Sequence, residues 1–339
     1  MFRCLSDVRE IASEVNIQMD YKLVFGREVL PFRVFATWNI HYGCNYKCTY
    51  CHAPKPGNNG AIEAVYIGSD RWIEIWRKQY DKYGTWEILI SGGEPFAYPG
   101  FMELIIELSK MHVINICTNL AWDVEKFVKN VNPEQFRIET SFHPEFADLR
   151  DFAAKLIILK RSGFSPTVNY VPWPPFLGKL KEFKEVIDET GCQITLQPFI
   201  GQYEGRSYPQ GYSEDEKKYF DIFTDECNRK TLSFKTSKEA DSTKGKLCRM
   251  GQNYVFINPD GSVSRCCRDH SFSLGNIIDG SFKLLEAPAP CAAQNCNCWR
   301  CMLTDKEDFW WRHWGRYDLT ERALKEKAPD LAEKYFSGK

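Results

Sequence analysis

The stretch RVFATWNIHYGCNYKCTYC (residues 33–51) joins an apolar strand candidate to three cysteines within eight residues. Residues 33–42 have the β-branched and aromatic composition of a strand, and Cys44, Cys48 and Cys51 follow it directly. Soft thiolates on so short a loop select zinc or an iron–sulfur cluster. Structural zinc takes four protein ligands, and the fourth candidate, His52, is too close to Cys51 to chelate well. We therefore expect a four-iron cluster with one iron left open to a substrate.

Beyond this loop, strand and helix patterns alternate up to residue 199, with short loops that contain Gly, Pro or Asn. Such alternation is typical of βα units around a parallel sheet. About 165 residues suit an incomplete barrel better than the roughly 250 of an eightfold one. The expected fold is therefore α/β, a partial (βα)6 TIM-like barrel. Its predicted strands are 33–42, 86–91, 113–118, 137–142, 164–171 and 193–199, and its predicted helices lie at 72–83, 99–110, 123–130, 149–162 and 178–190.

Two motifs in this region resemble a known family. GCNYKCTYCHAP (43–54) is similar to the CxxxCxxC signature of radical S-adenosylmethionine (SAM) enzymes, and SGGEP (91–95) resembles their GGEP motif. The resemblance covers roughly residues 33–200. It implies a [4Fe-4S] cluster on Cys44, Cys48 and Cys51 whose open iron binds the amine and carboxylate of SAM. Reductive cleavage of SAM then yields a 5′-deoxyadenosyl radical that abstracts hydrogen from the substrate.

The resemblance also implies where SAM is held. Backbone of the GGEP segment meets the methionine amine in the family, and an aromatic residue before the last cysteine is usual. The polar residues at the later strand ends are weaker candidates, because each could equally be a satisfied polar group. The SFH stretch (141–143) departs from the SLD of many relatives, so His143 could face substrate, carry a proton or be structural. The cofactor-binding candidates are Tyr50, Gly92, Gly93, Glu94, Thr118, Asn119, Ser141, Asn169 and Gln197.

A second cysteine cluster follows residue 248. Cys248, Gly261 and Cys266 fit a CX9–15GX4C element, and a closing Cys298-x2-Cys301 pair follows after a gap. This pattern resembles the SPASM/twitch extension of radical SAM enzymes and implies one auxiliary [4Fe-4S] cluster on those four cysteines. A zinc ribbon on the same four is the alternative.

Four further cysteines have less certain roles. Cys291 and Cys296 do not match the spacing for a second auxiliary cluster, although Cys296 could replace Cys298. Cys267 is a candidate hydrogen donor or a buried thiol, and Cys227 is a candidate hydrogen-atom donor. With His143, these two form the candidate catalytic set.

The domain organisation follows from these patterns. Ser213 with Glu216 predicts a capped helix near 214–228, the stretch 200–213 predicts a loop, and 235–246 is polar and expected to be exposed. NPDG (258–261) predicts a turn between two short strands. The predicted units are an N-terminal extension (1–32), the radical SAM partial barrel (33–204), a linker with a helix (205–247), a small Cys-rich auxiliary-cluster domain (248–304) and a helical tail (305–339).

Composition limits the partners. The 339 residues carry 44 Lys+Arg against 45 Asp+Glu, which does not favour a nucleic-acid-binding face. The sequence has no window of 18 uncharged apolar residues, so no membrane span is predicted. Its charged N-terminus does not resemble a signal peptide. We therefore expect a cytoplasmic protein, where 14 cysteines indicate metal rather than disulfides.

The predicted function is oxidation of a small molecule or short peptide, by dehydrogenation or cross-linking. A fully ligated auxiliary cluster favours electron acceptance, and a low-potential donor such as flavodoxin or ferredoxin is the implied partner. About 30 residues precede the first strand, too few for a peptide-recognition domain. PWPPF (172–176) and residues 201–212 are expected to line the substrate mouth. The alternatives are a redox-neutral epimerase of a peptide or carbohydrate, a non-catalytic iron–sulfur electron carrier and a zinc-dependent binding module. The GGEP motif disfavours the carrier, and the long βα region disfavours the module.

Overall fold

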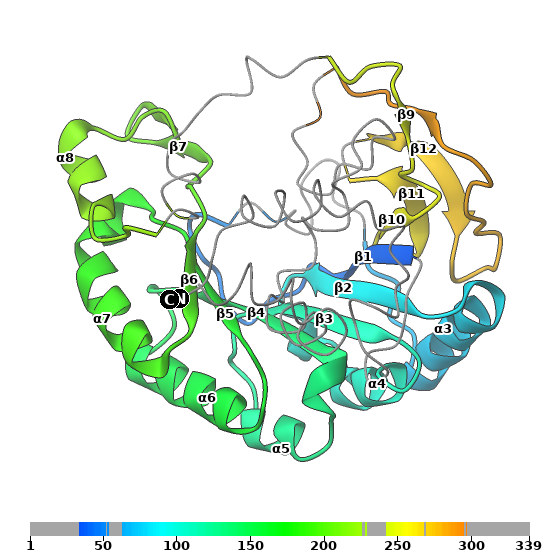
Figure 1. The fold of residues 1–339 in the computed structure, drawn as a ribbon, viewed down its shortest axis with the longest axis horizontal. Helices are drawn as coiled ribbons and strands as arrows, with labels where there is room; N and C mark the ends of the chain where they lie inside the picture. The colour runs from blue at the N-terminus through cyan, green and yellow to red at the C-terminus, as the bar shows by residue number, and fades with distance from the viewer. Residues whose placement is uncertain are drawn as a thin grey trace, which may run out of the picture.

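The computed structural model describes residues 34–51, 53, 63–225, 228, 242–267, 269–294 and 296. Six parallel strands, β1–β6, are neighbours in chain order, and one α-helix lies between each consecutive pair. Figure 1 shows these helices along the outer side of the curved sheet. The predicted partial (βα)6 barrel is confirmed.

The barrel elements match their predicted ranges closely. The strands are β1 (Val34–His41), β2 (Trp86–Gly92), β3 (Val113–Thr118), β4 (Phe136–Phe142), β5 (Thr167–Tyr170) and β6 (Gln193–Leu196). The α-helices are α3 (Ser69–Tyr83), α4 (Phe101–Leu108), α5 (Val124–Val128), α6 (Leu149–Arg161) and α7 (Leu180–Thr190), with short 3-10 helices η1 (Pro95–Ala97), η2 (Pro133–Gln135) and η3 (Pro174–Lys179).

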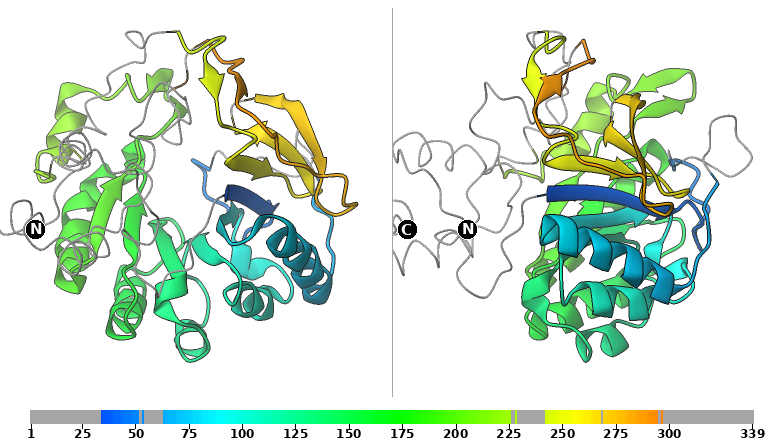
Figure 2. Two further views of the ribbon diagram at one scale, coloured as in Figure 1. Left: turned by 45° about the vertical axis from the view of Figure 1, so that its right-hand side comes forward. Right: turned by 90° about the vertical axis from the view of Figure 1, so that its right-hand side faces the viewer.

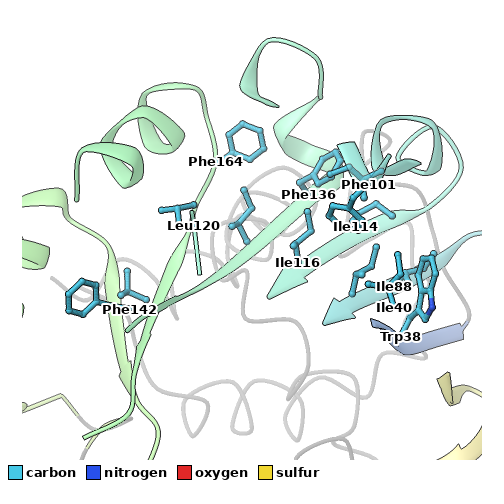
Figure 3. Close-up of a cluster of buried hydrophobic side chains, with 14 of the residues drawn as sticks. Trp38, Ile40, Ile88, Phe101, Ile114, Ile116, Leu120, Phe136, Phe142 and Phe164 are labelled. Carbon is cyan, nitrogen blue, oxygen red and sulfur yellow. The ribbon is translucent and has the colours of Figure 1, made fainter. Parts of the chain in front are cut away.

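The core lies between the sheet and these helices (Figure 3). Trp72 and Trp76 are one turn apart on α3, which places both rings on one helix face. Both rings meet Trp38 of β1, at centroid distances of 4.6 and 5.5 Å. The helical spacing of these tryptophans therefore reflects packing onto the sheet.

The strands of the cysteine-rich region extend the same sheet. β10 (Tyr254–Ile257) pairs in parallel with β1, and β11 (Ser262–Cys266) and β12 (Asp269–Asn276) continue the sheet in antiparallel order. The buried Tyr254 hydroxyl donates to Thr37 Oγ1 at 2.9 Å. Figure 2 shows these strands beside β1 at the edge of the barrel. Two short strands, β9 (Leu247–Cys248) and β13 (Ala289–Pro290), form a separate antiparallel pair.

Three local predictions need correction, and one is confirmed. Residues 200–213 form a hairpin, β7 (Gly201–Tyr203) with β8 (Arg206–Tyr208), rather than a loop alone. The Ser213 capping box is present, but α8 (Glu214–Lys217) gives way to η4 (Lys218–Phe220), because the aromatic and β-branched residues that follow favour helix weakly. Thr243 is buried, not exposed, because its hydroxyl donates to Ala293 O at 2.8 Å. The NPDG turn is confirmed by the bond from Gly261 N to Asn258 O.

The predicted domain limits stay predictions, and the N-terminal extension and helical tail lie outside the described residues. Within the described part of the chain, no helix combines the length and apolar character needed to cross a bilayer.

Candidate functional site

The first cysteine loop lies at the carboxyl end of β1. Cys48 is buried, Cys51 is exposed and Cys44 lies between these extremes. The loop closes on itself through Cys51 N–H, which donates to Cys48 O at 3.2 Å, and Tyr46 N–H donates to Cys44 Sγ at 3.3 Å. Hydrogen bonds to sulfur are one of the means by which proteins tune iron–sulfur clusters. The loop thus presents soft donors with one sulfur already supported by a backbone amide.

Burial favours the protonated form of two thiols in this loop. Burial raises the pKa of Cys48 to about 12, with further contributions from the Glu145 carboxylate and the neighbouring thiolates. Burial also raises the pKa of Cys44. A bound metal centre reverses this, because coordinated thiols are deprotonated. Among the described residues, no three His, Cys, Asp or Glu side chains lie close enough together to hold a single metal ion. The donor set fits a thiolate-ligated cluster, whose ligands are spread over several irons.

The backbones of Gly92 and Gly93 lie directly against the end of β1 and the start of the cysteine loop. A Cβ on Gly92 would lie 2.1 Å from His41 O, and one on Gly93 would lie 1.8 Å from Gly43 O. The Gly93 and Glu94 amides donate to these two carbonyls at 2.7 and 2.9 Å. Close backbone approach therefore explains both glycines, and the approaching group is the cysteine loop itself.

The Glu94 side chain faces the barrel wall. It is 3% exposed and accepts hydrogen bonds from Thr118 Oγ1 at 2.8 Å, Asn119 N at 2.7 Å and Phe96 N at 3.1 Å. Burial raises the pKa of Glu94 to about 6, against the lowering effect of these donors. The carboxylate thus joins the ends of β2 and β3. Its backbone carbonyl accepts from His41 Nε2 at 2.8 Å, with the ring orientation assigned from the bonding pattern.

Thr118 and Asn119 continue this network to the cysteines. The Thr118 hydroxyl also accepts from Leu120 N and Trp122 Nε1. The Asn119 amide donates to Asn45 Oδ1 at 2.8 Å and lies 3.9 Å from Cys44 Sγ. The two side chains are thus bonded within the protein, and their contact with SAM stays a prediction.

The remaining polar candidates line the later strand ends. Ser141 and Asn169 are register partners on β4 and β5. Gln197 follows β6, and its Nε2 donates to Asn169 Oδ1 at 3.4 Å. The structure therefore brings these three residues to one edge of the sheet, and their contact with SAM stays a prediction.

Tyr50, which lies in the cysteine loop, forms a pair with His143, which directly follows β4. Their side chains are bonded between Tyr50 OH and His143 Nδ1 at 3.0 Å. Burial lowers the pKa of His143 to about 4, so the ring is neutral at pH 7. The Tyr50 ring also lies 5.5 Å from Trp173, which in turn lies 5.4 Å from Tyr203 of the hairpin.

Glu145 is a site residue that the sequence reasoning missed. Its carboxylate accepts from Thr49 N at 2.9 Å and from the Thr49 hydroxyl, between Cys48 and Cys51. The only available signal was its position two residues after His143, at the end of a barrel strand.

The second cysteine cluster is described in part. Cys248 on β9 and Cys266 on β11 are both buried, and Cys267 is half-buried in the turn that follows. Cys291 Sγ lies 3.8 Å from Thr243 Oγ1, which accepts from Cys296 N at 3.0 Å. The ladder between β9 and β13 pairs Ala289 with Cys248, and Cys291 N–H donates to Lys246 O at 2.8 Å. Cys227, Cys298 and Cys301 lie outside the described residues.

Comparison with known proteins gives two family matches and several relatives. Residues 38–174 match the radical SAM superfamily, and residues 248–302 match an iron–sulfur cluster-binding domain named SPASM; together they cover more than half of the chain. The sporulation killing factor maturation protein SkfB of Bacillus subtilis is 22% identical over 78% of this chain and 68% of its own. A cysteine-type anaerobic sulfatase-maturating enzyme of Clostridium perfringens is 26% identical over 72% of this chain and 77% of its own. The solved structure of anSMEcpe with bound AdoMet has the same fold, with a TM-score of 0.52 at 16% identity over 90% of this chain and 96% of that one.

Proposed function

We propose that this chain, which belongs to the radical SAM superfamily and carries a SPASM-type iron–sulfur cluster-binding domain, oxidises a peptide or small-molecule substrate. The family implies SAM, a SAM-binding [4Fe-4S] cluster and an auxiliary iron–sulfur cluster. When bound together, the reduced cluster and SAM supply a 5′-deoxyadenosyl radical that removes a hydrogen atom from the substrate. The observation that carries the proposal is the cysteine loop packed on Gly92 and Gly93.

The proposed tasks of the residues follow from their positions. Cys44, Cys48 and Cys51 hold the SAM-binding cluster, and Tyr46 N–H and the Asn119 amide support the Cys44 sulfur. The Glu94 carboxylate fixes the GGEP segment by its bonds to Thr118 and Asn119, and this segment is proposed to meet the methionine part of SAM. These residues bind and orient the reactants, while the cofactor supplies the reactivity.

The substrate entrance is proposed on the aromatic side of the loop. Trp173 connects Tyr50 to Tyr203 of the hairpin, and Phe146 stacks on Tyr46 at 5.2 Å and is 46% exposed. Aromatic side chains bury a large area and exclude water around a reacting group. A peptide substrate is favoured because SkfB is named as a maturation protein and the clostridial relative as a sulfatase-maturating enzyme.

The SPASM-type domain would hold the auxiliary cluster, and such a cluster would supply the one-electron acceptor that net oxidation of the substrate requires. Cys248 and Cys266 are its described candidate ligands, and Cys298 and Cys301 complete the proposed set. A low-potential donor such as flavodoxin or ferredoxin is proposed to reduce the SAM-binding cluster.

The test is a cysteine replacement on the full chain. Changing Cys44, Cys48 and Cys51 together to alanine is expected to abolish SAM cleavage and leave about four irons per chain at the auxiliary site. The matched control is Cys192→Ala, a buried thiol at the start of β6, which is expected to keep SAM cleavage and both clusters. SAM cleavage by the triple variant, or loss of all iron from a folded triple variant, would contradict the proposal.

A further inference from the structure

Arg265 is a buried cation at the centre of the cysteine-rich region. It is the penultimate residue of β11 and is 3% exposed. Its guanidinium donates to four backbone carbonyls and lies 5.5 Å from the centroid of the Phe272 ring. The four bonds run from Nε to Met250 O at 3.1 Å, from Nη1 to Pro290 O at 2.6 Å, and from Nη2 to Cys248 O at 3.3 Å and Ala289 O at 2.6 Å.

All of these partners are neutral. A buried charge costs free energy unless an opposite charge compensates it. The barrel shows the usual solution, because Arg137 Nη1 lies 3.0 Å from Glu87 Oε1. Within the described part of the chain, no carboxylate forms an ion pair with Arg265. Carbonyl dipoles satisfy its donors but leave its charge unbalanced.

The position of Arg265 indicates what balances it. Cys266 is the next residue along β11, and the carbonyl of Cys248 is a direct hydrogen-bond partner. The guanidinium is thus bonded to the backbone of the residue that carries one proposed cluster ligand, and it belongs to the residue that directly precedes another. A cluster held by thiolates carries net negative charge in its protein-bound form.

We propose that Arg265 is a positioning residue and counter-charge for the auxiliary iron–sulfur cluster, an inference that rests on the cluster in the proposed function. Three of its four hydrogen bonds join β9 and β13 to β11, and they thereby tie Cys248 to the strand that carries Cys266. Its charge stabilises the reduced cluster more than the oxidised one, because reduction adds one negative charge. Arg265 thereby raises the reduction potential, which makes the cluster a better electron acceptor.

The experiment uses the full chain with Cys44, Cys48 and Cys51 changed to alanine, so that only the auxiliary cluster contributes signal. Arg265→Met removes the charge at similar size, and Arg265→Lys keeps the charge but cannot reach four carbonyls. Arg249→Met is the matched control, because Arg249 is exposed and adjacent to Cys248. The readouts are iron per chain, the midpoint potential from an EPR-monitored redox titration and the rate of iron loss to a chelator.

R265M is expected to shift the midpoint potential to more negative values, whereas R249M and R265K stay near the unsubstituted background protein. R265K is expected to lose iron to the chelator several-fold faster, because the hydrogen bonds to β9 and β13 are incomplete. A purely structural role would change stability and leave the potential unmoved.

Two results would overturn the assignment. Equal potentials for R265M and R249M refute the counter-charge, and unchanged iron loss in R265K refutes the role in holding the strands. If R265M does not fold, Arg265→Gln replaces it in the comparison of potentials, because Gln also removes the charge and its amide can still donate to backbone carbonyls. A background protein without iron would instead overturn the auxiliary cluster itself, which separates failure of the proposed function from failure of the role of Arg265.

Discussion

Replacing Gly93 by alanine is expected to force the cysteine loop away from β2. The three atoms nearest to the added Cβ are backbone atoms of Tyr42 and Gly43, the closest at 1.8 Å, whereas ordinary contact begins at 3.4 Å. No side chain can rotate away to make room, so the two backbone segments must separate. Overpacking of this kind costs about 1–3 kcal/mol, and weakening the two amide bonds to His41 O and Gly43 O adds about 1 kcal/mol each. We expect a loss of about 3–5 kcal/mol in the free energy of unfolding.

The assay is urea denaturation of the metal-free protein, with iron binding measured in parallel. Gly178→Ala is the matched control, because a Cβ at Gly178 meets no atom within 4 Å. The control is expected to stay within about 0.5 kcal/mol of the wild type. If Gly93→Ala has the same denaturation midpoint as the control and binds iron normally, the close packing of the loop on β2 is refuted.

Three further predictions concern hydrogen bonds and charge. Glu145→Gln is expected to speed iron loss to a chelator and cost about 1 kcal/mol, because a neutral amide oxygen accepts more weakly than the carboxylate that bonds the amide and hydroxyl of Thr49. Tyr50→Phe is expected to cost about 1 kcal/mol in urea denaturation, because it removes the hydrogen bond between the Tyr50 hydroxyl and His143 Nδ1. Burial lowers the pKa of His112 to about 4, so the unfolded chain takes up a proton at a higher pH than the folded protein does. The free energy of unfolding of the wild type is therefore expected to fall by up to about 3 kcal/mol as the pH drops from 6.5 toward 4. In His112→Gln this contribution to the pH dependence of the free energy of unfolding is absent. Urea denaturation of both proteins at several pH values measures the difference.

Each of these predictions has a contrary result. Wild-type iron loss in Glu145→Gln would show that Glu145 does not hold the loop. A wild-type denaturation midpoint in Tyr50→Phe would show that the bond between the Tyr50 hydroxyl and His143 contributes no stability. An unchanged difference between wild type and His112→Gln from pH 7 to pH 4.5 would show that His112 titrates with its ordinary pKa.

The barrel was predictable because its signals are local. The range of β3 was predicted without error, and the strand ends placed Asn169 and Gln197 together. The sequence analysis explained Gly92 and Gly93 by contact of their backbone with SAM. In the structure, the groups that lie against these glycines are backbone atoms of the protein. The motifs and the hydrophobic periodicity thus predicted where the site lies. The contacts that hold the site together are visible only in the three-dimensional structure.

The extension of the sheet was not predictable in this way. β10 pairs with β1 across more than 200 residues of sequence, and no local pattern encodes such a parallel pairing. Likewise, Arg265 bonds backbone carbonyls and Glu145 bonds the backbone amide of Thr49 as well as its hydroxyl, and backbone groups leave no residue-type signature in the partner. Charged residues beside a motif are usually solvated, so only burial and bonding single these two out.

The central claim is most directly tested by anaerobic reconstitution of the whole protein, followed by dithionite and SAM. The account predicts about eight irons per chain and release of 5′-deoxyadenosine. Bound zinc in place of iron, with no cleavage of SAM, would contradict it.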